Sequence, residues 1–260
     1  MTTQQLIYET AVPVSAGRHG KVSVDIQDYG FSRKVNSVPL MAVEFPLAAA
    51  DYAIVFAVNG EQVVPVVILG ARQEENLYVG ADGKWLAAYV PAFVRRYPFV
   101  FATSEDGKTF TLCIDESHPG VNYLGKGQAL FDGEGKPTPY VQNVLQFLQE
   151  YRAQFDRTQA FAAKVQALGL LEPMQAQFSL STGEKMSLTG FMAIDRAKLK
   201  ALDAAKLADL VQTDEMELIH LHLYSMRNFV SVKDKLVSLA PAADAPPAAA
   251  AAAADTTTQA

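Results

Sequence analysis

The sequence has one cysteine and no long uninterrupted apolar run. Cys113 alone cannot form an intramolecular disulfide, and its apolar neighbours Leu112 and Ile114 predict a small core residue rather than a nucleophile. The longest apolar stretch, residues 38–58, is broken by two prolines and two acidic residues, whereas a membrane span needs about 20 mostly apolar residues. We therefore expect a soluble chain with no membrane span.

The sequence also lacks an excess of basic residues. With 22 Lys and Arg against 28 Asp and Glu, the formal net charge is −6, which argues against a protein that finds nucleic acid through bulk charge. Residues 1–8 contain neither a positively charged segment nor an apolar segment of the kind that directs secretion. The sequence thus predicts a cytoplasmic protein; surface association would need a signal-independent export route.

The familiar catalytic and cofactor motifs are missing as well. The sequence contains no glycine-rich dinucleotide or phosphate loop, no G-x-S-x-G, no H-E-x-x-H and no pair of C-x-x-C motifs. With four histidines, the sequence offers few ligands for a metal centre. We therefore predict neither a bound metal nor a cofactor.

The first half of the chain is rich in strand signals. Residues 53–58 and 62–69 are β-branched runs on either side of Asn59-Gly60, which predicts a hairpin with a type I′ turn at these two residues. Pro65 cannot donate a ladder hydrogen bond, so we expect it at a sheet edge or a bulge. A second hairpin is predicted over residues 99–114, around an Asp-Gly turn.

The second half is mostly helical in pattern. The apolar pattern predicts a helix over 139–168 with an interruption near 156–158, followed by strands over 174–180 and 185–194 that residues 181–184 join. Two short helices, capped by Asp195 and Asp203, come next. The final predicted helix covers 214–239 and carries Ile219, Leu223, Met226 and Val230 on one face. Strands before helices predict an α+β fold, with an antiparallel β-rich N-terminal half that carries hairpins and a helical C-terminal half packed on it. We expect one domain over 1–239 and a disordered Ala/Pro-rich tail over 240–260.

The segment 89–98 is the most unusual part of the sequence. Pro91 can open a short helix, and Arg95 and Arg96 follow among the aromatic residues Trp85, Tyr89, Phe93, Tyr97 and Phe99. A guanidinium held by aromatic faces can bind a carboxylate or a phosphate, so this segment is our candidate for recognition of an anionic group. The alternative is that one arginine pairs with an internal carboxylate such as Asp115 or Glu116, and that the other arginine is exposed.

The histidines give a second set of candidates. His118 follows Asp115 and Glu116 closely, a grouping that suits acid–base chemistry, although four polar residues before a proline also fit a solvated loop. His220 and His222 form the other close group. Two residues apart on a helix they point to opposite sides, which predicts one surface histidine and one core histidine rather than a shared metal.

The order of the segments and their amino-acid sequences resemble the bacterial SapC family over about residues 5–239. The residues that carry the resemblance are Val38-Pro-Leu-Met-Ala-Val-Glu-Phe45, Tyr52-Ala-Ile-Val-Phe56, Leu69-Gly-Ala-Arg-Gln-Glu-Glu-Asn-Leu-Tyr78, Asp82-Gly-Lys-Trp85, Tyr89-Val-Pro-Ala92, Arg95-Arg-Tyr-Pro-Phe99, Leu112-Cys-Ile-Asp115, Leu130-Phe131, Gly190-Phe191, Asp195 and His222-Leu-Tyr-Ser-Met-Arg-Asn228. The family name is associated with surface-layer proteins of certain bacteria, and some members look like companions of outer-membrane uptake systems. The resemblance carries over no catalytic residues.

Three hypotheses follow from the sequence. The leading one is an accessory or binding protein connected with envelope, surface-layer or outer-membrane uptake function, which binds a protein or a small anionic ligand through the segment 85–98. The alternative is an enzyme that acts on a small molecule or peptide through His118 or His222 with Asp115 or Glu116. The third is a structural lattice subunit, which the net charge makes less favourable. The oligomeric state stays open.

Overall fold

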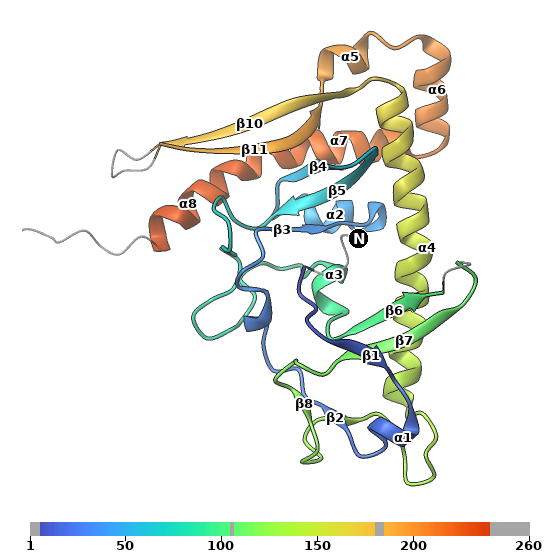
Figure 1. Cartoon of the computed structure of the whole chain (residues 1–260). Helices are drawn as coiled ribbons and strands as arrows, with labels where there is room; N and C mark the ends of the chain where they lie inside the picture. The colour runs from blue at the N-terminus through green and yellow to red at the C-terminus, as the bar shows by residue number, and fades with distance from the viewer. Residues whose placement is uncertain (1–5, 105–106, 180–184, 240–260) are drawn as a thin grey trace, which may run out of the picture.

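The computed structural model describes residues 6–104, 107–179 and 185–239. Within these ranges the strands form three antiparallel sheets, and helices cover them, which confirms the predicted α+β class (Figure 1). The largest sheet has the strand order β10-β11-β4-β5-β3. Its strands are β3 (Ser37–Pro39), β4 (Ile54–Asn59), β5 (Gln62–Ile68), β10 (Leu171–Ser179) and β11 (Lys185–Ile194).

The first predicted hairpin, β4–β5, is confirmed, but its turn lies one residue later than expected. Asn59 pairs with Gln62, so the loop residues are Gly60 and Glu61. Gly60 has φ of +63°, which a glycine adopts at little cost. The sequence pattern therefore identified the hairpin correctly and its register wrongly.

The expectation that Pro65 lies at a sheet edge or bulge is wrong. β5 runs between β4 and β3, and its pairing with β4 shows no register shift. Leu40 donates a backbone hydrogen bond to the Pro65 carbonyl (3.0 Å), one residue after the end of β3 at Pro39. In an antiparallel sheet the nitrogen and the carbonyl of one residue point towards the same neighbouring strand. The nitrogen of Pro65 therefore faces Leu40, just past the end of β3, and its missing N–H falls outside the β3–β5 ladder.

Two smaller sheets are formed by the remaining strands, which all come from the first half of the chain. One has the order β1-β7-β6, with β1 at Ala11–Pro13, β6 at Phe99–Thr103 and β7 at Phe110–Asp115. The other has the order β8-β2-β9, with β2 at Ser23–Val24, β8 at Val121–Asn122 and β9 at Gln128–Ala129. The short helices of this half are α1 (Ala16–His19), α2 (Phe45–Ala48) and α3 (Ala92–Arg95). The second predicted hairpin is β6–β7, and part of its turn lies outside the described residues.

Helix α4 (Pro139–Ala167) joins two hydrophobic clusters. Its first half packs Val141 and Leu148 into the cluster around β2, β6 and β7, and its second half packs Phe161 and Val165 into the cluster of the five-stranded sheet (Figure 1). The predicted interruption near 156–158 is wrong. The Thr158 hydroxyl donates to the Gln154 carbonyl (2.6 Å), which lets a polar side chain sit inside a continuous helix.

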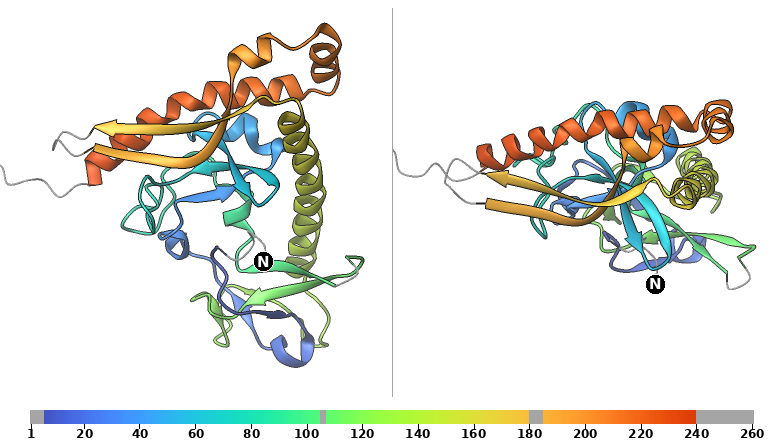
Figure 2. Two further views of the ribbon diagram at one scale, coloured as in Figure 1. Left: turned by 45° about the horizontal axis from the view of Figure 1, so that its top comes forward. Right: turned by 90° about the horizontal axis from the view of Figure 1, so that it is seen from above.

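The C-terminal helices are α5 (Arg196–Lys200), α6 (Ala204–Gln212), α7 (Glu215–Ser225) and α8 (Phe229–Leu239). Asp195 and Asp203 cap α5 and α6 as predicted. The strand pair β10–β11 is also confirmed, and its connection at residues 181–184 lies outside the described residues, as does the predicted tail. Figure 2 shows α7 and α8 running side by side with the β10–β11 hairpin.

The single helix predicted over 214–239 is in fact two helices. A 3-10 turn, Met226–Asn228, separates α7 from α8. At this turn the Asn228 amide donates to the carbonyls of Ala49 (2.9 Å) and Tyr52 (2.8 Å). The predicted apolar face also shifts after the turn, because Val230 is 62% exposed whereas Val232 is fully buried.

We predict that Asn228→Ala lowers the free energy of unfolding by about 2 kcal/mol, because it leaves two buried carbonyls without their donor. Val230→Ala, two residues away on the exposed side, is the control and should change stability by less than about 0.5 kcal/mol. Urea unfolding followed by circular dichroism measures both. Equal effects of the two substitutions would contradict the role assigned to Asn228.

Candidate functional site

The segment that follows Trp85 is held in place by one buried carboxylate, Glu44. Its Oε1 accepts hydrogen bonds from the Ala92 backbone (2.7 Å) and from the Tyr89 hydroxyl (2.7 Å), and its Oε2 accepts one from the Met41 backbone (2.8 Å). Burial raises the pKa of Glu44, and these donors partly offset that effect. Pro91 precedes α3 as predicted, so Glu44 fixes the start of the helix that carries both candidate arginines.

Arg95 lies at the end of α3 with an exposed but oriented guanidinium. Nε donates to the Val90 carbonyl (3.0 Å), and Nη2 donates to the Tyr89 hydroxyl (3.2 Å). The guanidinium carbon lies 5.6 Å from the centre of the Tyr89 ring and 5.4 Å from that of Phe147. Within the described ranges, Nη1 has no hydrogen-bond or carboxylate partner. This nitrogen can therefore receive an anion without breaking a contact.

Arg95 borders a cleft of about 630 Å³ between α2, α3 and the middle of α4. The lining residues are Met41, Val43, Glu44, Leu47, Ala88, Tyr89, Val90, Ala92, Arg95, Phe147, Glu150, Tyr151 and Gln154. We call this hollow the Arg95 cleft. The two carboxylates of the lining, Glu44 and Glu150, accept hydrogen bonds from the protein itself. Val43 and Leu47 are 57% and 59% exposed at its border, so the cleft offers an apolar surface next to one oriented cation. That combination suits a ligand with an apolar body and an anionic group.

Arg96, the next residue, has the opposite environment. It is 4% exposed, and its guanidinium carbon lies 4.3 Å from the centre of the Phe93 ring and 4.7 Å from that of Tyr151. In the described part of the chain its Nε and Nη2 have no hydrogen-bond partner. Stacking between aromatic faces stabilises this cation and ties α3 to α4. Arg96 is therefore not accessible to a ligand in this structure.

The predicted internal carboxylate partners of the arginines pair with other groups. Asp115 accepts hydrogen bonds from the backbones of Glu9 (2.7 Å) and Thr10 (3.1 Å), and these bonds and Ser117 hold its pKa below the usual value despite burial. Glu116 forms a bidentate ion pair with Arg18, with distances of 2.8 and 2.6 Å. The alternative that Asp115 or Glu116 neutralises Arg95 or Arg96 is thus wrong.

The other aromatic candidates of this segment lie away from the arginines. The Trp85 indole donates to the Tyr52 hydroxyl (2.7 Å). The Tyr97 ring packs against Phe31, with centroids 4.5 Å apart, and its hydroxyl donates to Asp115 (3.4 Å). The arginines contact two of the predicted local rings, Tyr89 and Phe93. They also contact rings from distant parts of the chain, which no local pattern in the sequence could indicate: Phe147 and Tyr151 on α4, and Tyr8 near the N-terminus.

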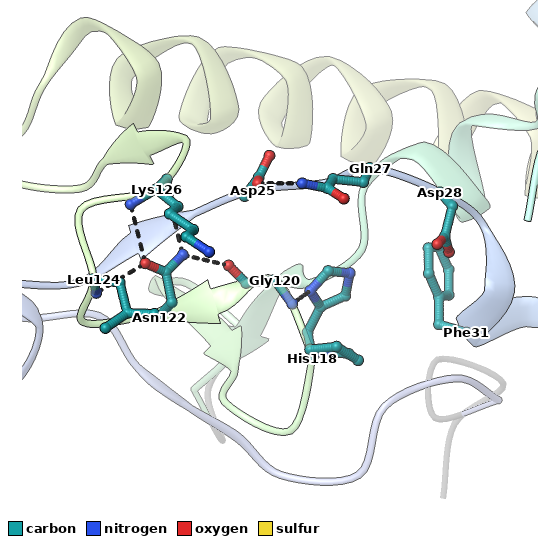
Figure 3. Close-up of a pocket in the computed structure, with 10 residues that line it drawn as sticks. Asp25, Gln27, Asp28, Phe31, His118, Gly120, Asn122, Leu124 and Lys126 are labelled. Carbon is teal, nitrogen blue, oxygen red and sulfur yellow. Dashed lines mark hydrogen bonds between the residues drawn. The ribbon is translucent and has the colours of Figure 1, made fainter.

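His118 lines a separate pocket, shown in Figure 3. Its Nδ1 accepts a hydrogen bond from the Gly120 backbone (2.8 Å), and burial lowers the pKa of the ring. Among the described residues no hydrogen bond or ion pair joins His118 to a carboxylate. The carboxylates that share its pocket are Asp25 and Asp28, about ninety residues earlier, and not the predicted Asp115 or Glu116. Sequence reasoning missed both.

His222 lies in the core and takes part in the main sheet. Its Nδ1 donates to the Ile54 carbonyl (2.8 Å), and its Nε2 accepts from the Ile194 backbone (3.0 Å). Full burial lowers its pKa to about 4. His220 is exposed, which confirms one core and one surface histidine. No three His, Cys, Asp or Glu side chains in the described ranges gather closely enough to hold a metal ion.

Comparisons with known proteins give one match. A family model described as SapC matches residues 14–232. The search of curated proteins found no significant match, and neither did the search of solved structures. None of the helices in the described part of the chain has the length and apolar character needed to cross a membrane.

We predict that His222 makes stability depend on pH below neutrality. Its folded pKa of about 4 lies below the ordinary value of 6.5, so the unfolded state binds the proton more readily. The contribution is complete above about pH 6.5 and is lost as the pH falls towards about 4, by on the order of 3 kcal/mol. Urea unfolding of the wild type and of His222→Gln across this range measures it.

The stability difference between the wild type and His222→Gln should therefore shrink as the pH falls. His220→Gln is the matched control and should follow the wild type at every pH. A constant difference between wild type and His222→Gln from pH 7 to pH 4 would show that the ring is not held neutral by its surroundings.

Proposed function

This chain belongs to the SapC family, and we propose that it works as a binding protein rather than as an enzyme. Its ligand carries an anionic group, a carboxylate, next to an apolar body, and it enters the Arg95 cleft. The ligand is either a free small molecule or the end of a partner protein chain, since both present the same chemistry.

The observation that carries this proposal is the state of the Arg95 guanidinium. Two of its nitrogens hold it to Val90 and Tyr89, and the third is without a partner in the described residues. An arginine that is already oriented loses little side-chain entropy when it binds a carboxylate. The apolar lining of the cleft and the exposed side chains of Val43 and Leu47 supply the surface for the rest of the ligand.

The place of action belongs to the same proposal. Following the association of the family name, we propose that the protein serves envelope, surface-layer or outer-membrane uptake functions from inside the cell. Fractionation of the native host into cytoplasm, envelope and medium tests this part.

The enzymatic alternative has less support from the geometry. It needs a histidine and a carboxylate within hydrogen-bond reach, with the histidine able to take up a proton. The one lone pair of neutral His118 already accepts from Gly120, and both nitrogens of His222 are bonded inside the sheet. Asp115 is engaged with backbone donors. Glu116 does lie within hydrogen-bond reach of His19 Nε2 (3.1 Å), but the same carboxylate is held in the ion pair with Arg18, and the other His19 nitrogen already accepts from the Ser15 backbone (3.2 Å).

We predict that Arg95→Gln weakens binding of an amphipathic carboxylate roughly 10- to 100-fold, the usual contribution of a hydrogen bond to a charged group. Decanoate is the probe, and decanol is its neutral counterpart. The melting temperature should stay close to that of the wild type, because Arg95 is exposed. Isothermal titration calorimetry measures binding, and native mass spectrometry of protein from its own host shows what the cleft carries there.

Arg227→Gln is the matched control, since Arg227 is also exposed and lies 3.9 Å from the centre of the Tyr224 ring, outside the cleft. It should leave decanoate binding unchanged. Arg96→Met should lower the melting temperature instead. If Arg95→Gln and Arg227→Gln bind decanoate equally, or if decanol binds as tightly as decanoate, recognition of an anion by Arg95 is excluded.

A further inference from the structure

The His118 pocket has a volume of about 320 Å³ and shares no lining residue with the Arg95 cleft. It lies between residues 25–28 and residues 118–126, two segments that approach each other very closely. A Cβ on Gly120 would lie 2.0 Å from the Asp25 carbonyl oxygen, and one on Gly127 would lie 2.3 Å from that of Val24. Because these glycines have no side chain, the backbones of the two segments can pack directly against each other beside the pocket.

Asn122 locks the loop that forms one side of the pocket. Its Nδ2 donates to the carbonyls of Ser23 (3.2 Å), Gly120 (3.0 Å) and Lys126 (3.0 Å). Its Oδ1 accepts from the backbones of Leu124 (3.0 Å) and Lys126 (3.1 Å). The amide is thus used by the protein itself, and Figure 3 shows it inside the loop. The pocket is preformed, which lowers the entropy cost of binding.

His118 presents a hydrogen-bond donor to this pocket. Because Nδ1 accepts from Gly120, the neutral ring carries its proton on Nε2. The ring is 6% exposed and packs against Phe31 and Tyr97, with centroids 5.7 and 5.1 Å away. Nε2 has no hydrogen-bond partner in the described residues, and it points towards the hollow between Gln27 and Asp28 (Figure 3). This N–H is therefore available to donate to a ligand or to water.

Acceptors face the same pocket. Asp25 uses Oδ2 to accept from the Gln27 amide (2.7 Å), and Asp28 uses Oδ1 to accept from the Gly30 backbone (2.7 Å). The second oxygen of each carboxylate and the amide oxygen of Gln27 have no partner within the described ranges. The Lys126 ammonium also lines the pocket without a described partner. Donors and acceptors are therefore mixed around one cavity.

We propose that this pocket binds a neutral ligand rich in hydroxyl groups, of the saccharide class. A hydroxyl group both donates and accepts, so neighbouring hydroxyls can serve the carboxylates and the His118 N–H at once. An anion would meet Asp25 and Asp28, and a cation would meet the His118 N–H and Lys126. The Phe31 ring offers an apolar wall for the C–H face of a sugar, and the volume lies at the small end of ligand pockets.

The test uses glucose, N-acetylglucosamine and ribose as probes, with putrescine and inorganic phosphate as the cationic and anionic comparisons. Nitrogen-15 NMR of the full-length protein follows the His118 ring signals, and saturation-transfer difference NMR detects the bound sugar. At least one sugar should shift the Nε2 signal of His118 in a saturable manner. Asp28→Asn, which replaces a free acceptor by a donor, should weaken that binding at least about 5-fold.

Asp132→Asn is the matched control, because Asp132 also accepts backbone hydrogen bonds in an exposed turn, from Glu134 and Lys136. It should leave sugar binding unchanged. Arg95→Gln should also leave sugar binding unchanged, so failure of this proposal can be distinguished from failure of the proposed binding in the Arg95 cleft. The proposal is overturned if no sugar shifts the His118 signals, if putrescine or phosphate binds in its place, or if Asp28→Asn and Asp132→Asn behave alike.

Discussion

The arrangement of the molecule depends on one imidazole ring inserted into a sheet. The register of the β4–β11 pairing, continued by two residues, places Ile194 opposite Ile54. Direct ladder bonds do not join these two residues; His222 bridges them, accepting from the Ile194 nitrogen and donating to the Ile54 oxygen. Ser225, one turn later on α7, accepts from the Ile54 nitrogen at 3.0 Å. Helix α7 is thereby hydrogen-bonded to the two inner strands β4 and β11, whereas apolar contact alone would allow it to slide.

This insertion extends through buried polar contacts to the Arg95 cleft. Asn228 follows His222 at the spacing of two helical turns and holds the carbonyls of Ala49 and Tyr52, which fixes the corner between α2 and β4. The Tyr52 hydroxyl donates in turn to the Tyr89 carbonyl. Glu44 holds the Tyr89 hydroxyl from the other side. These buried polar residues therefore form one connected support for the cleft.

Short sequence patterns predicted local structure correctly in several places, but they could not predict contacts between residues far apart in the chain. Asp195 and Asp203 cap their helices because a cap needs only the next three residues. The α+β class followed from the order of strand and helix patterns. By contrast, Tyr151 contacts Arg96, and Asp28 shares a pocket with His118, only because the chain folds back over many residues. The carboxylate partners predicted for the arginines were therefore wrong, and the role of the predicted site residues stays a prediction.

Arg95 and Arg96 are adjacent in the sequence, and the sequence alone does not show which of them is accessible for binding and which has a structural role. Neighbours on a helix point about 100° apart, so a four-residue helix directs the two side chains into different surroundings. Arg96 enters the aromatic space between Phe93 and Tyr151, where its charge serves to join two helices. Arg95 stays at the surface, with its orientation set by Tyr89. Since an anion can approach only an accessible cation, we propose Arg95, and not Arg96, as the recognition residue of this segment.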